Sequence, residues 1–397
     1  NGLLVFNSTS PITLNQFFSV VSGTGNIWVR STGLVKVSAA NTYTGWVLID
    51  PGATFQPFEG NQGQFVGSVI TNNGTLFLTG QEAPATRGFT NNIVGTGRVL
   101  KENNNQNEGW IIFAGNNTYS GGTFLAGGGI SLGDGVTPGV GSIVGPVVFT
   151  NTATQFKNPR RLVFNRPDDY VFTNTVISVV TDGSAVQDQG ALRHMGPGVL
   201  TLAGNISYPG TTTIDPGMTL IVGTGGTSGS IGTGEVVNDG FFVVNKSSDT
   251  TIPGTISGSG SLVKMGTGIL TLGGNGTYFG ETTVSNGTLF INNNHAASQV
   301  LVYGGTLGGT GTISGPVTTE VGTKLAAGAS PTSIGTLTFN NFLSINGDVA
   351  VKVNRSLAQS NDVFVVNGGV FKTGGGTLTV ANLGPDLVVG DKFYLFS

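Results

Sequence analysis

The chain has 397 residues, with 67 Gly, 15 Pro and no Cys, and only 37 side chains are charged, 17 Lys and Arg against 20 Asp and Glu. The net charge of −3 excludes a nucleic-acid reader that neutralises phosphates, and the lack of Cys excludes disulfides, iron–sulfur clusters and thiolate zinc sites. An apolar share of 38% is too high for a disordered chain, and no apolar run approaches the roughly eighteen residues of a membrane-spanning helix.

Short alternating strands followed by Gly or Asn recur along the whole sequence, and no helical period extends over about eleven residues. We therefore predict an all-β protein. The clearest expected strands, in chain order, are residues 3–6, 76–78, 200–202, 270–272, 337–339, 378–380 and 393–396.

One frame recurs four times: a Tyr, a Gly two residues later, and a second Gly seven residues after the first. Its members are Tyr43, Gly45 and Gly52; Tyr119, Gly121 and Gly128; Tyr208, Gly210 and Gly217; and Tyr278, Gly280 and Gly287. The tyrosines are 76, 89 and 70 residues apart. A single solenoid turn needs about 20 to 30 residues, so each repeat unit is expected to supply three or four turns.

Two further markers accompany the frame. Gly-Ser/Thr-Gly triplets occur at residues 23–25, 95–97 and 258–260, and Asn165-Arg166-x-x-Asp169 is echoed by Asn245-Lys246-x-x-Asp249. Equivalent Gly and Tyr residues in successive coils suit corners where backbones approach closely and rings stack. Parallel strands need crossovers, which are nearly always right-handed.

The fold prediction is therefore a right-handed parallel β-helix, or β-solenoid, that forms one continuous elongated rod over residues 1–397. Residues 1–22 are expected to form an N-terminal strand or cap region. Residues 23–300 hold the repeat units, and residues 301–397 form C-terminal coils or a cap region.

Four segments resemble the autotransporter-associated β-strand repeat of bacterial surface proteins. The match is best at residues 266–289 and 196–220 and weaker at 115–130 and 41–55. The stretch from Gly304 to Phe396 is similar to the region on the C-terminal side of such repeats. The resemblance implies a secreted bacterial β-helix, located outside the cell or on its surface, whose repeat motif is structural and carries no catalytic residues. Asn1 indicates a processed or truncated start.

The densest charge cluster comprises Lys157, Arg160, Arg161, Arg166, Asp168 and Asp169. Such a cluster suits an anion or sugar-acid site. It equally suits a solvated corner with local ion pairs, which usually signify little. The echo of Asn-Arg/Lys-x-x-Asp around Asp249 favours the corner, because a repeated element is usually architectural.

A second candidate site lies in an apparent insertion. Asp169 precedes Tyr208 by 39 residues, whereas Asp249 precedes Tyr278 by 29, so about ten residues are expected to form a lateral loop. This segment holds Asp182, Asp188, Arg193 and His194. Two carboxylates with a His and an Arg form a glycosidase or lyase site if they converge, which the sequence does not show.

Other chemistry has little support. No Gly-Lys-Ser/Thr follows the Gly-rich triplets, so they are not expected to bind phosphate. His194 and His295 are 101 residues apart, and no zinc motif or periodic calcium-binding Asp is present. No metal or cofactor is expected. Trp28, Trp46 and Trp110 suit a sugar-stacking platform or coil packing, and Trp28 and Trp46 are close enough to one coil apart to stack on each other.

The leading functional hypothesis is a non-enzymatic extracellular structural or adhesive protein. Because uncapped terminal coils expose unpaired backbone groups, we expect self-association, with head-to-tail filament growth as its form. Two alternatives stay open: a polysaccharide lyase or hydrolase built on a β-helix, and a monomeric glycan-binding adhesin module. The fold does not decide among them.

Overall fold

The computed structural model describes residues 2–8, 15–17, 20–37, 41–57, 67–79, 88–102, 110–151 and 159–397. These form two compact units. Unit 1 takes residues 1–200 and 204–212, and unit 2 takes residues 201–203 and 213–397. Within the described ranges every regular element is a strand except the one-turn 3-10 helix η1 (Val186–Asp188). The all-β prediction is confirmed.

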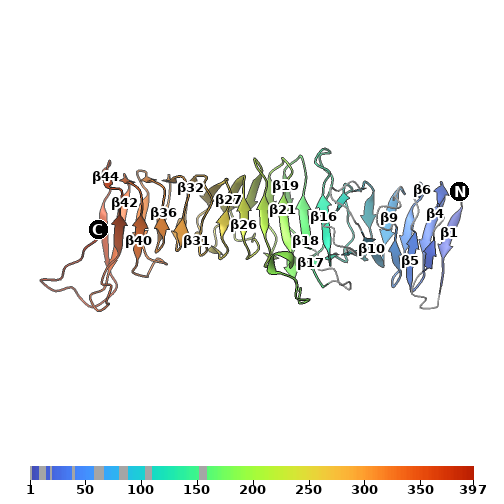
Figure 1. The fold of residues 1–397 in the computed structure, drawn as a ribbon, viewed down its shortest axis with the longest axis horizontal. Coiled ribbons are helices and arrows are strands. Elements are labelled where there is room, and N and C mark those ends of the chain that lie inside the picture. The colour runs from blue at the N-terminus through green and yellow to red at the C-terminus, as the bar shows by residue number, and fades with distance from the viewer. Residues whose placement is uncertain are drawn as a thin grey trace. The chain divides into compact units, whose positions relative to one another are not determined.

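Unit 1 contains three sheets and one strand pair (Figure 1). The first sheet has the order β1 (Leu3–Phe6), β4 (Asn26–Val29), β7 (Val47–Ile49), β9 (Val69–Asn72), β12 (Asn92–Val94). The second has the order β2 (Asn15–Phe17), β5 (Leu34–Val37), β8 (Thr54–Gln56), β10 (Thr75–Thr79), β13 (Arg98–Glu102), β15 (Thr123–Leu125), β17 (Val147–Phe149), β20 (Val176–Ser178), β23 (Ile206–Ser207). The third comprises β11 (Gly88–Phe89), β14 (Trp110–Phe113), β16 (Gly128–Leu132), β18 (Arg160–Phe164) and β21 (Ala191–His194). The pair is β3 (Ser22–Gly23) with β6 (Thr42–Tyr43), and β19 (Tyr170–Phe172) completes the unit.

Unit 2 is built in the same way. One sheet runs β25 (Thr219–Val222), β27 (Phe241–Asn245), β30 (Ser261–Met265), β32 (Thr282–Val284), β35 (Val300–Val302), β38 (Val317–Thr319), β41 (Leu343–Ile345), β44 (Val370–Lys372). The seven-stranded sheet runs β28 (Thr250–Ile252), β31 (Ile269–Leu272), β33 (Thr288–Ile291), β36 (Thr306–Gly309), β39 (Lys324–Ala327), β42 (Asp348–Val353), β45 (Leu378–Asn382). The third face comprises the pair β26 (Val236–Asn238) and β29 (Ile256–Ser257), and the sheet β34 (Asn294–His295), β37 (Thr312–Ile313), β40 (Thr336–Phe339), β43 (Val363–Val366). Strands β22 (Leu200–Leu202) and β24 (Thr212–Ile214) fall where the chain passes between units.

In each unit the chain visits the faces in turn, so that neighbouring strands of a sheet come from successive coils and pair in parallel. In unit 2 the order β35, β36, β37 is followed by β38, β39, β40, and each strand pairs with its counterpart one coil later. In unit 1 the paired residues Ile27, Val47, Ile70 and Ile93 are 20 to 23 residues apart. Both units are therefore parallel β-solenoids with three strands to a coil, as the repeats predicted.

The core is a stack of inward side chains, one from each coil on each face. Leu270, Leu289, Leu307 and Leu325 occupy one register row of the seven-stranded sheet and are wholly buried. Alternation along a strand puts the intervening residues on the outer face. Burying each such aliphatic side chain contributes about 1.5–3 kcal/mol, which compensates for the lack of disulfides.

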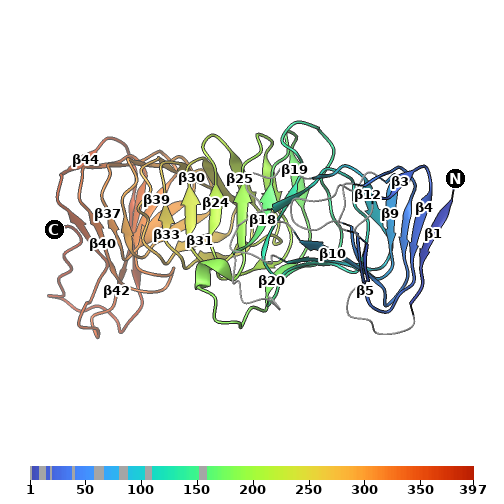
Figure 2. The same ribbon diagram turned by 45° about the vertical axis from the view of Figure 1, so that its right-hand side comes forward.

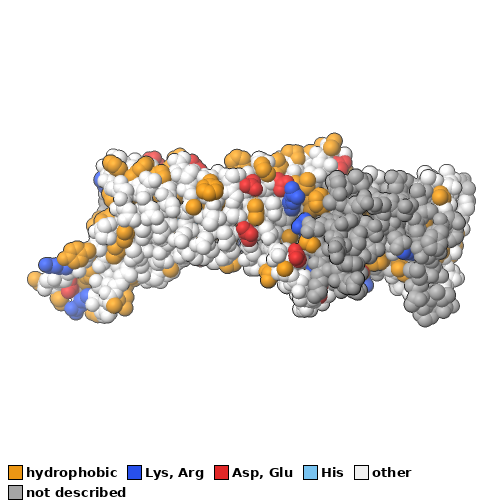
Figure 3. Space-filling model, in the orientation of Figure 1, with side chains coloured by type: hydrophobic (Ala, Val, Ile, Leu, Met, Phe, Trp, Pro, Cys, Tyr) orange, Lys and Arg blue, Asp and Glu red, His pale blue; other side chains and the backbone are white. Residues whose placement is uncertain are grey.

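The outer faces carry little charge. In the view of Figure 3, uncharged and apolar side chains make up most of the described surface, and Lys, Arg, Asp and Glu are scattered among them. This agrees with the low charged fraction of 9%.

The predicted strand at residues 3–6 is confirmed as β1, but the one at 393–396 is wrong. In that segment Phe396 forms only an isolated bridge to Phe364, and the last regular strand is β45. Strands β44 and β45 are exposed along their length. The expectations of one continuous helix over residues 1–397, and of terminal regions at 1–22 and 301–397, stay predictions.

Candidate functional site

The repeat tyrosines are buried at the corners of the coils. Tyr43, Tyr119, Tyr208 and Tyr278 are at most 2% exposed. In three of the four units the hydroxyl pairs with the Thr four residues on: Tyr119 with Thr123 at 2.6 Å, Tyr208 with Thr212 at 2.7 Å and Tyr278 with Thr282 at 2.5 Å. Burial raises the pKa of each of Tyr43, Tyr119 and Tyr278 above the usual range. These phenols stay neutral, and their role is to hold a corner.

The repeat glycines are required by the backbone. A Cβ on Gly45, Gly121, Gly210 or Gly280 would lie within 3.0 Å of the backbone carbonyl of Gly25, Gly97, Gly190 or Gly260, respectively, in the preceding coil. The second glycine of each frame has a positive φ, +82° at Gly52, +68° at Gly128, +79° at Gly217 and +73° at Gly287. The first glycine of each frame thus leaves room for the preceding coil, and the second adopts a backbone conformation that only Gly reaches without strain.

The Gly-Ser/Thr-Gly triplets are also corners. In two of the three, the middle residue is held by an acceptor one coil earlier: the Ser259 amide and hydroxyl both donate to Asp239 Oδ1 at 2.9 Å. The Thr96 amide and hydroxyl donate to Asn73 in the same way, at 3.2 and 3.3 Å. The amides that a phosphate would need are therefore already engaged.

The two Asn-Arg/Lys-x-x-Asp motifs have the same structural role. Asp169 accepts a hydrogen bond from the Val199 amide at 2.8 Å, and Asp249 accepts one from the Ile269 amide at 3.0 Å. Each motif's cation donates to a backbone carbonyl of an adjacent loop, Arg166 to Val140 and Lys246 to Gly229 at 2.7 Å. Arg166 also pairs with Asp168 at 2.7 Å and stacks over Tyr170. The motif is a corner brace.

Arg160, from the predicted charge cluster, is not solvated but wholly buried. Its guanidinium donates to the Thr150 carbonyl at 2.9 Å, to Ser184 Oγ at 3.0 Å and to the Asp188 carbonyl at 3.2 Å, and it pairs with the Asp182 carboxylate. Its neighbour Arg161 is partly exposed on the other side of β18. Lys157 lies outside the described residues.

The predicted insertion is the loop at residues 179–190, between β20 and β21, and it includes η1 (Figure 2). The Asp182 carboxylate pairs with Arg160, and its Oδ1 accepts hydrogen bonds from the Ser184 amide at 3.1 Å and the Ser184 hydroxyl at 2.6 Å. Arg193 and His194 are consecutive on β21, so they face opposite sides, His194 into the core and Arg193 outward. The four residues do not form one site.

Sequence reasoning missed two buried lysines, Lys101 and Lys264, which occupy the same place in the repeat as His194. Lys101, His194 and Lys264 each follow a stacked glycine by four residues and are at most 2% exposed. Their fixed spacing from Gly97, Gly190 and Gly260 was a signal available in the sequence.

The Lys264 ammonium group donates to the carbonyls of Met265, Gly266 and Asn286 at 2.7, 2.8 and 3.1 Å. Burial lowers its pKa to about 8, against the effect of the Asp249 carboxylate. Burial likewise lowers the pKa of Lys101 to about 7, against the effect of Glu102. Lys101 donates to the Glu102 and Gly127 carbonyls. These ammonium groups stabilise the corners of the coils by hydrogen bonds to backbone carbonyls.

His295 adds a third partner to one Tyr–Thr pair. Its Nε2 lies 2.8 Å from the Tyr278 hydroxyl and 3.0 Å from the Thr282 hydroxyl, and the His295 and Tyr278 rings meet edge to face. Burial lowers the pKa of His295 to about 4. The imidazole is therefore neutral at physiological pH and part of the core.

His295 is expected to make the protein acid-labile. The unfolded chain binds the imidazole proton below pH about 6.5, whereas the folded chain binds it only near pH 4. The free energy of unfolding therefore falls by up to about 3 kcal/mol between pH 6.5 and 4. Urea unfolding of the wild type and His295→Gln at pH 7 and 4.5 measures this. A pH dependence equally steep in both proteins contradicts it, because other groups titrate alike in each.

The stacking of Trp28 on Trp46 that the sequence suggested is absent. Trp28 lies opposite Leu48 in register, its Nε1 donates to Asp50 at 2.9 Å, and the Arg30 guanidinium covers its ring at 4.4 Å. No aromatic platform formed by Trp28 and Trp46 is present.

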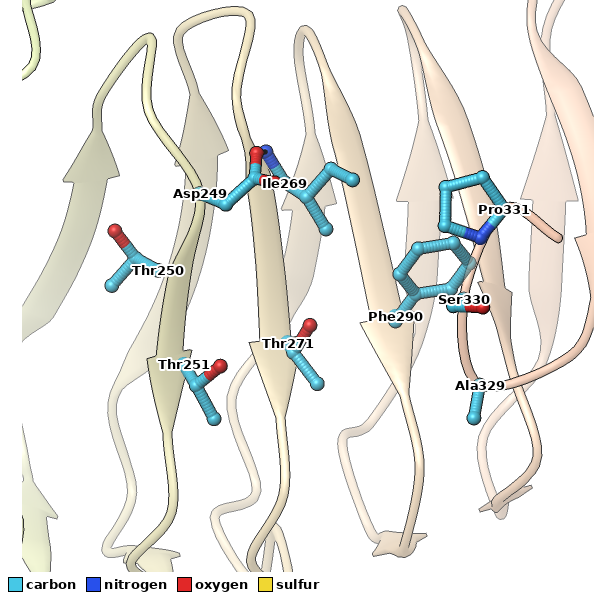
Figure 4. A pocket seen from close by; sticks show the side chains of 9 residues that line it. All are labelled: Asp249, Thr250, Thr251, Ile269, Thr271, Phe290, Ala329, Ser330 and Pro331. Atoms are coloured by element: carbon cyan, nitrogen blue, oxygen red, sulfur yellow. Dashed lines mark hydrogen bonds between the residues drawn. The ribbon is translucent and has the colours of Figure 1, made fainter. Parts of the chain in front are cut away.

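A groove lies on the outer face of the seven-stranded sheet of unit 2, with a volume of about 310 Å³ (Figure 4). Thr251 and Thr271 are register partners on its floor, with Asp249 and Ile269 one row above. Phe290 and the loop residues Ala329, Ser330 and Pro331 form its wall. Sequence reasoning did not find this groove, because it depends on where residues 328–335 lie.

The described residues show no gathering of three His, Asp or Glu side chains that could hold a metal ion. Among the same residues, no helix has the length and apolar character needed to cross a bilayer.

Comparison with known proteins identifies the repeats. The family described as Passenger-associated-transport-repeat matches residues 110–132, 195–222 and 262–290. These are the three units with a Tyr–Thr hydrogen bond, whereas in the Tyr43 unit the Thr position is Val47.

A stretch of 83 residues, 20% of the chain, is 45% identical to the protein named Adhesin BmaC autotransporter from Brucella suis biovar 1 (strain 1330), and the match spans 2% of that protein's length. No solved structure matches the chain significantly. The buried Tyr–Thr corners and stacked glycines of this β-solenoid are therefore those of passenger-associated-transport repeats, the β repeats associated with autotransporters.

Proposed function

We propose that this chain is a segment of a bacterial protein displayed on or secreted from the cell surface, and that it acts in adhesion. The observation that carries the proposal is the set of three passenger repeats, together with the 45% identity to a protein named as an autotransporter adhesin. In this role the coils are the scaffold, and their outer faces and loops bind.

We propose a non-enzymatic role in place of the lyase or hydrolase. Of the two carboxylates that the sequence offered for catalysis, Asp182 and Asp188, the first is neutralised by the buried Arg160. The His beside it on the chain, His194, faces the core. A glycosidase needs two carboxyl groups flanking one bond, and this pairing supplies a structural brace instead.

We further propose self-association through the coil that carries β44 and β45, with a second copy of the chain as the partner. Val370, Phe371, Leu378 and Val380 on these strands are 45 to 57% exposed. β44 and β45 are each the last strand of their sheet. An exposed apolar strand edge is a template for another chain, and a small net charge opposes contact only weakly.

The adhesion and self-association proposals can be tested on the purified chain. Beads coated with it are expected to adhere to polysaccharide- and protein-coated surfaces more than albumin-coated beads do. In sedimentation velocity, Leu378→Lys with Val380→Lys is expected to reduce association, and the exposed control Val321→Lys is not. Retention equal to albumin contradicts adhesion, and a monomer at the highest soluble concentration contradicts self-association.

A further inference from the structure

We propose that the groove of unit 2 lined by Asp249, Thr251, Thr271, Phe290 and Pro331 binds one ring of a neutral saccharide. This inference rests on the adhesive function proposed above and names its ligand class. The groove volume of about 310 Å³ is at the lower end of the range for small-molecule sites.

The floor of the groove is a set of outward side chains fixed by strand pairing. Thr251 on β28 and Thr271 on β31 are direct register partners, and Phe290 on β33 is the next member of that row. Figure 4 shows the two threonines on neighbouring strands below Asp249 and Ile269. Because paired parallel strands are about 4.8 Å apart, the two hydroxyls are spaced for contact with one small ligand.

The wall of the groove exists because the chain departs from the coil at Gly328. That residue has a φ of +110°, its amide donates to the Gly309 carbonyl at 2.9 Å, and the chain rejoins the solenoid at β40. The Asn292 side chain donates to the Ala329 carbonyl at 3.3 Å, and the Ser330 amide donates to Ser333 Oγ at 2.8 Å. These bonds hold residues 329–331 over the sheet.

Phe290 faces outward yet is only 3% exposed. Its register partner on β36 is Gly308, where a Cβ would lie 2.7 Å from the ring, so glycine makes room for it. The ring and Pro331 together give the groove an apolar end, and the hydroxyls give it a polar floor.

This mixture fits a sugar. A hexose offers hydroxyls that both donate and accept and a face of C–H groups that packs on apolar carbon. The threonine hydroxyls can match the first of these features, and Ile269 and Pro331 the second. Asp249 Oδ1 is held by the Ile269 amide, which fixes the carboxylate, and the carboxylate accepts strongly from ligand hydroxyls.

The lining disfavours other ligands. It includes one carboxylate and no Lys, Arg or His, so a phosphate or a sugar acid would be repelled. A single carboxylate is too few ligands for Ca²⁺. The polar floor is unsuited to an acyl chain.

The test uses the full chain, with ¹³C-labelled threonine methyl groups observed by NMR during titration with methyl β-glucoside, methyl β-galactoside and methyl α-mannoside. We expect the Thr251 and Thr271 methyl signals to shift with at least one glycoside, with a Kd on the order of 1 mM for a single ring. Glucuronate and inorganic phosphate are the charged counter-probes and are expected to cause no shift.

The variants Thr271→Val and Asp249→Asn are each expected to weaken binding about fivefold or more. Valine keeps the shape of threonine, and asparagine can still accept from the Ile269 amide, so both variants should fold. Thr318→Val on β38, an outward threonine of another sheet, is the matched control and should bind as the wild type does.

No methyl shift with any neutral glycoside, a preference for glucuronate or phosphate, or unchanged binding by both groove variants overturns the inference. Its failure is distinct from failure of the adhesive function. If beads coated with the wild-type chain and with the Asp249→Asn chain adhere equally, and no glycoside shifts the methyl signals, only the proposed saccharide site is contradicted. If the chain binds a glycoside in a way that depends on Thr271, but beads coated with it do not adhere, only the proposed adhesive function is contradicted.

Discussion

Replacing Gly280 with alanine is expected to lower the free energy of unfolding by about 3 kcal/mol or more. The new Cβ would lie within 3.0 Å of the Gly260 backbone carbonyl in the preceding coil. That atom is backbone, so relief requires two coils to separate, which also disturbs the buried Tyr278–Thr282 pair. Urea unfolding followed by circular dichroism measures the loss.

Gly226→Ala is the matched control in the same unit. No atom lies within 4 Å of a Cβ at Gly226, and its φ is not in the left-handed region. Its effect should stay within about 0.5 kcal/mol. If the Gly280 and Gly226 variants were equally stable, close contact with the preceding coil would not be the reason for glycine at position 280.

Replacing Arg160 with methionine should cost about 3–5 kcal/mol, because it leaves a partly buried carboxylate without its partner. The guanidinium joins the Thr150 and Asp188 carbonyls, Ser184 and Asp182, so the loop at residues 179–190 also loses its anchor. Urea unfolding measures the stability, and limited proteolysis should show faster cleavage within that loop.

Arg161→Met, at the next position of β18, provides the comparison. Arg161 is partly exposed, and exposed charge pairs contribute about 1 kcal/mol or less. Proteolysis at 179–190 that is no faster in the Arg160 variant than in the Arg161 variant would show that Arg160 does not anchor the loop.

The coil architecture was predictable because its determinants are local and periodic. A Tyr–Gly frame with the same internal spacing in all four copies specifies corners, and alternating residues such as 270–272 specify faces. The insertion before Tyr208 was also countable from the sequence, since two copies of one motif differ in length.

Contacts between coils could not be read in the same way. Asp182 and Arg160 are 22 residues apart, and only the coil period brings them together. Consecutive residues such as Arg193 and His194 looked like one cluster, yet strand alternation separates them. The groove depends on the path of residues 328–335, which no repeat specifies. At 393–396 a continuous apolar run suggested a strand, but only Phe396 forms a β-bridge.

The parallel pairing of each coil with the coils before and after it has a consequence for survival outside a cell. A cut in a surface loop such as 179–190 severs one peptide bond, but β20 and β21 on either side remain hydrogen-bonded to other strands. The two fragments are expected to stay associated, because the strand-to-strand hydrogen bonds that join them do not depend on the cleaved peptide bond. A nicked molecule would therefore keep its form in a protease-rich environment.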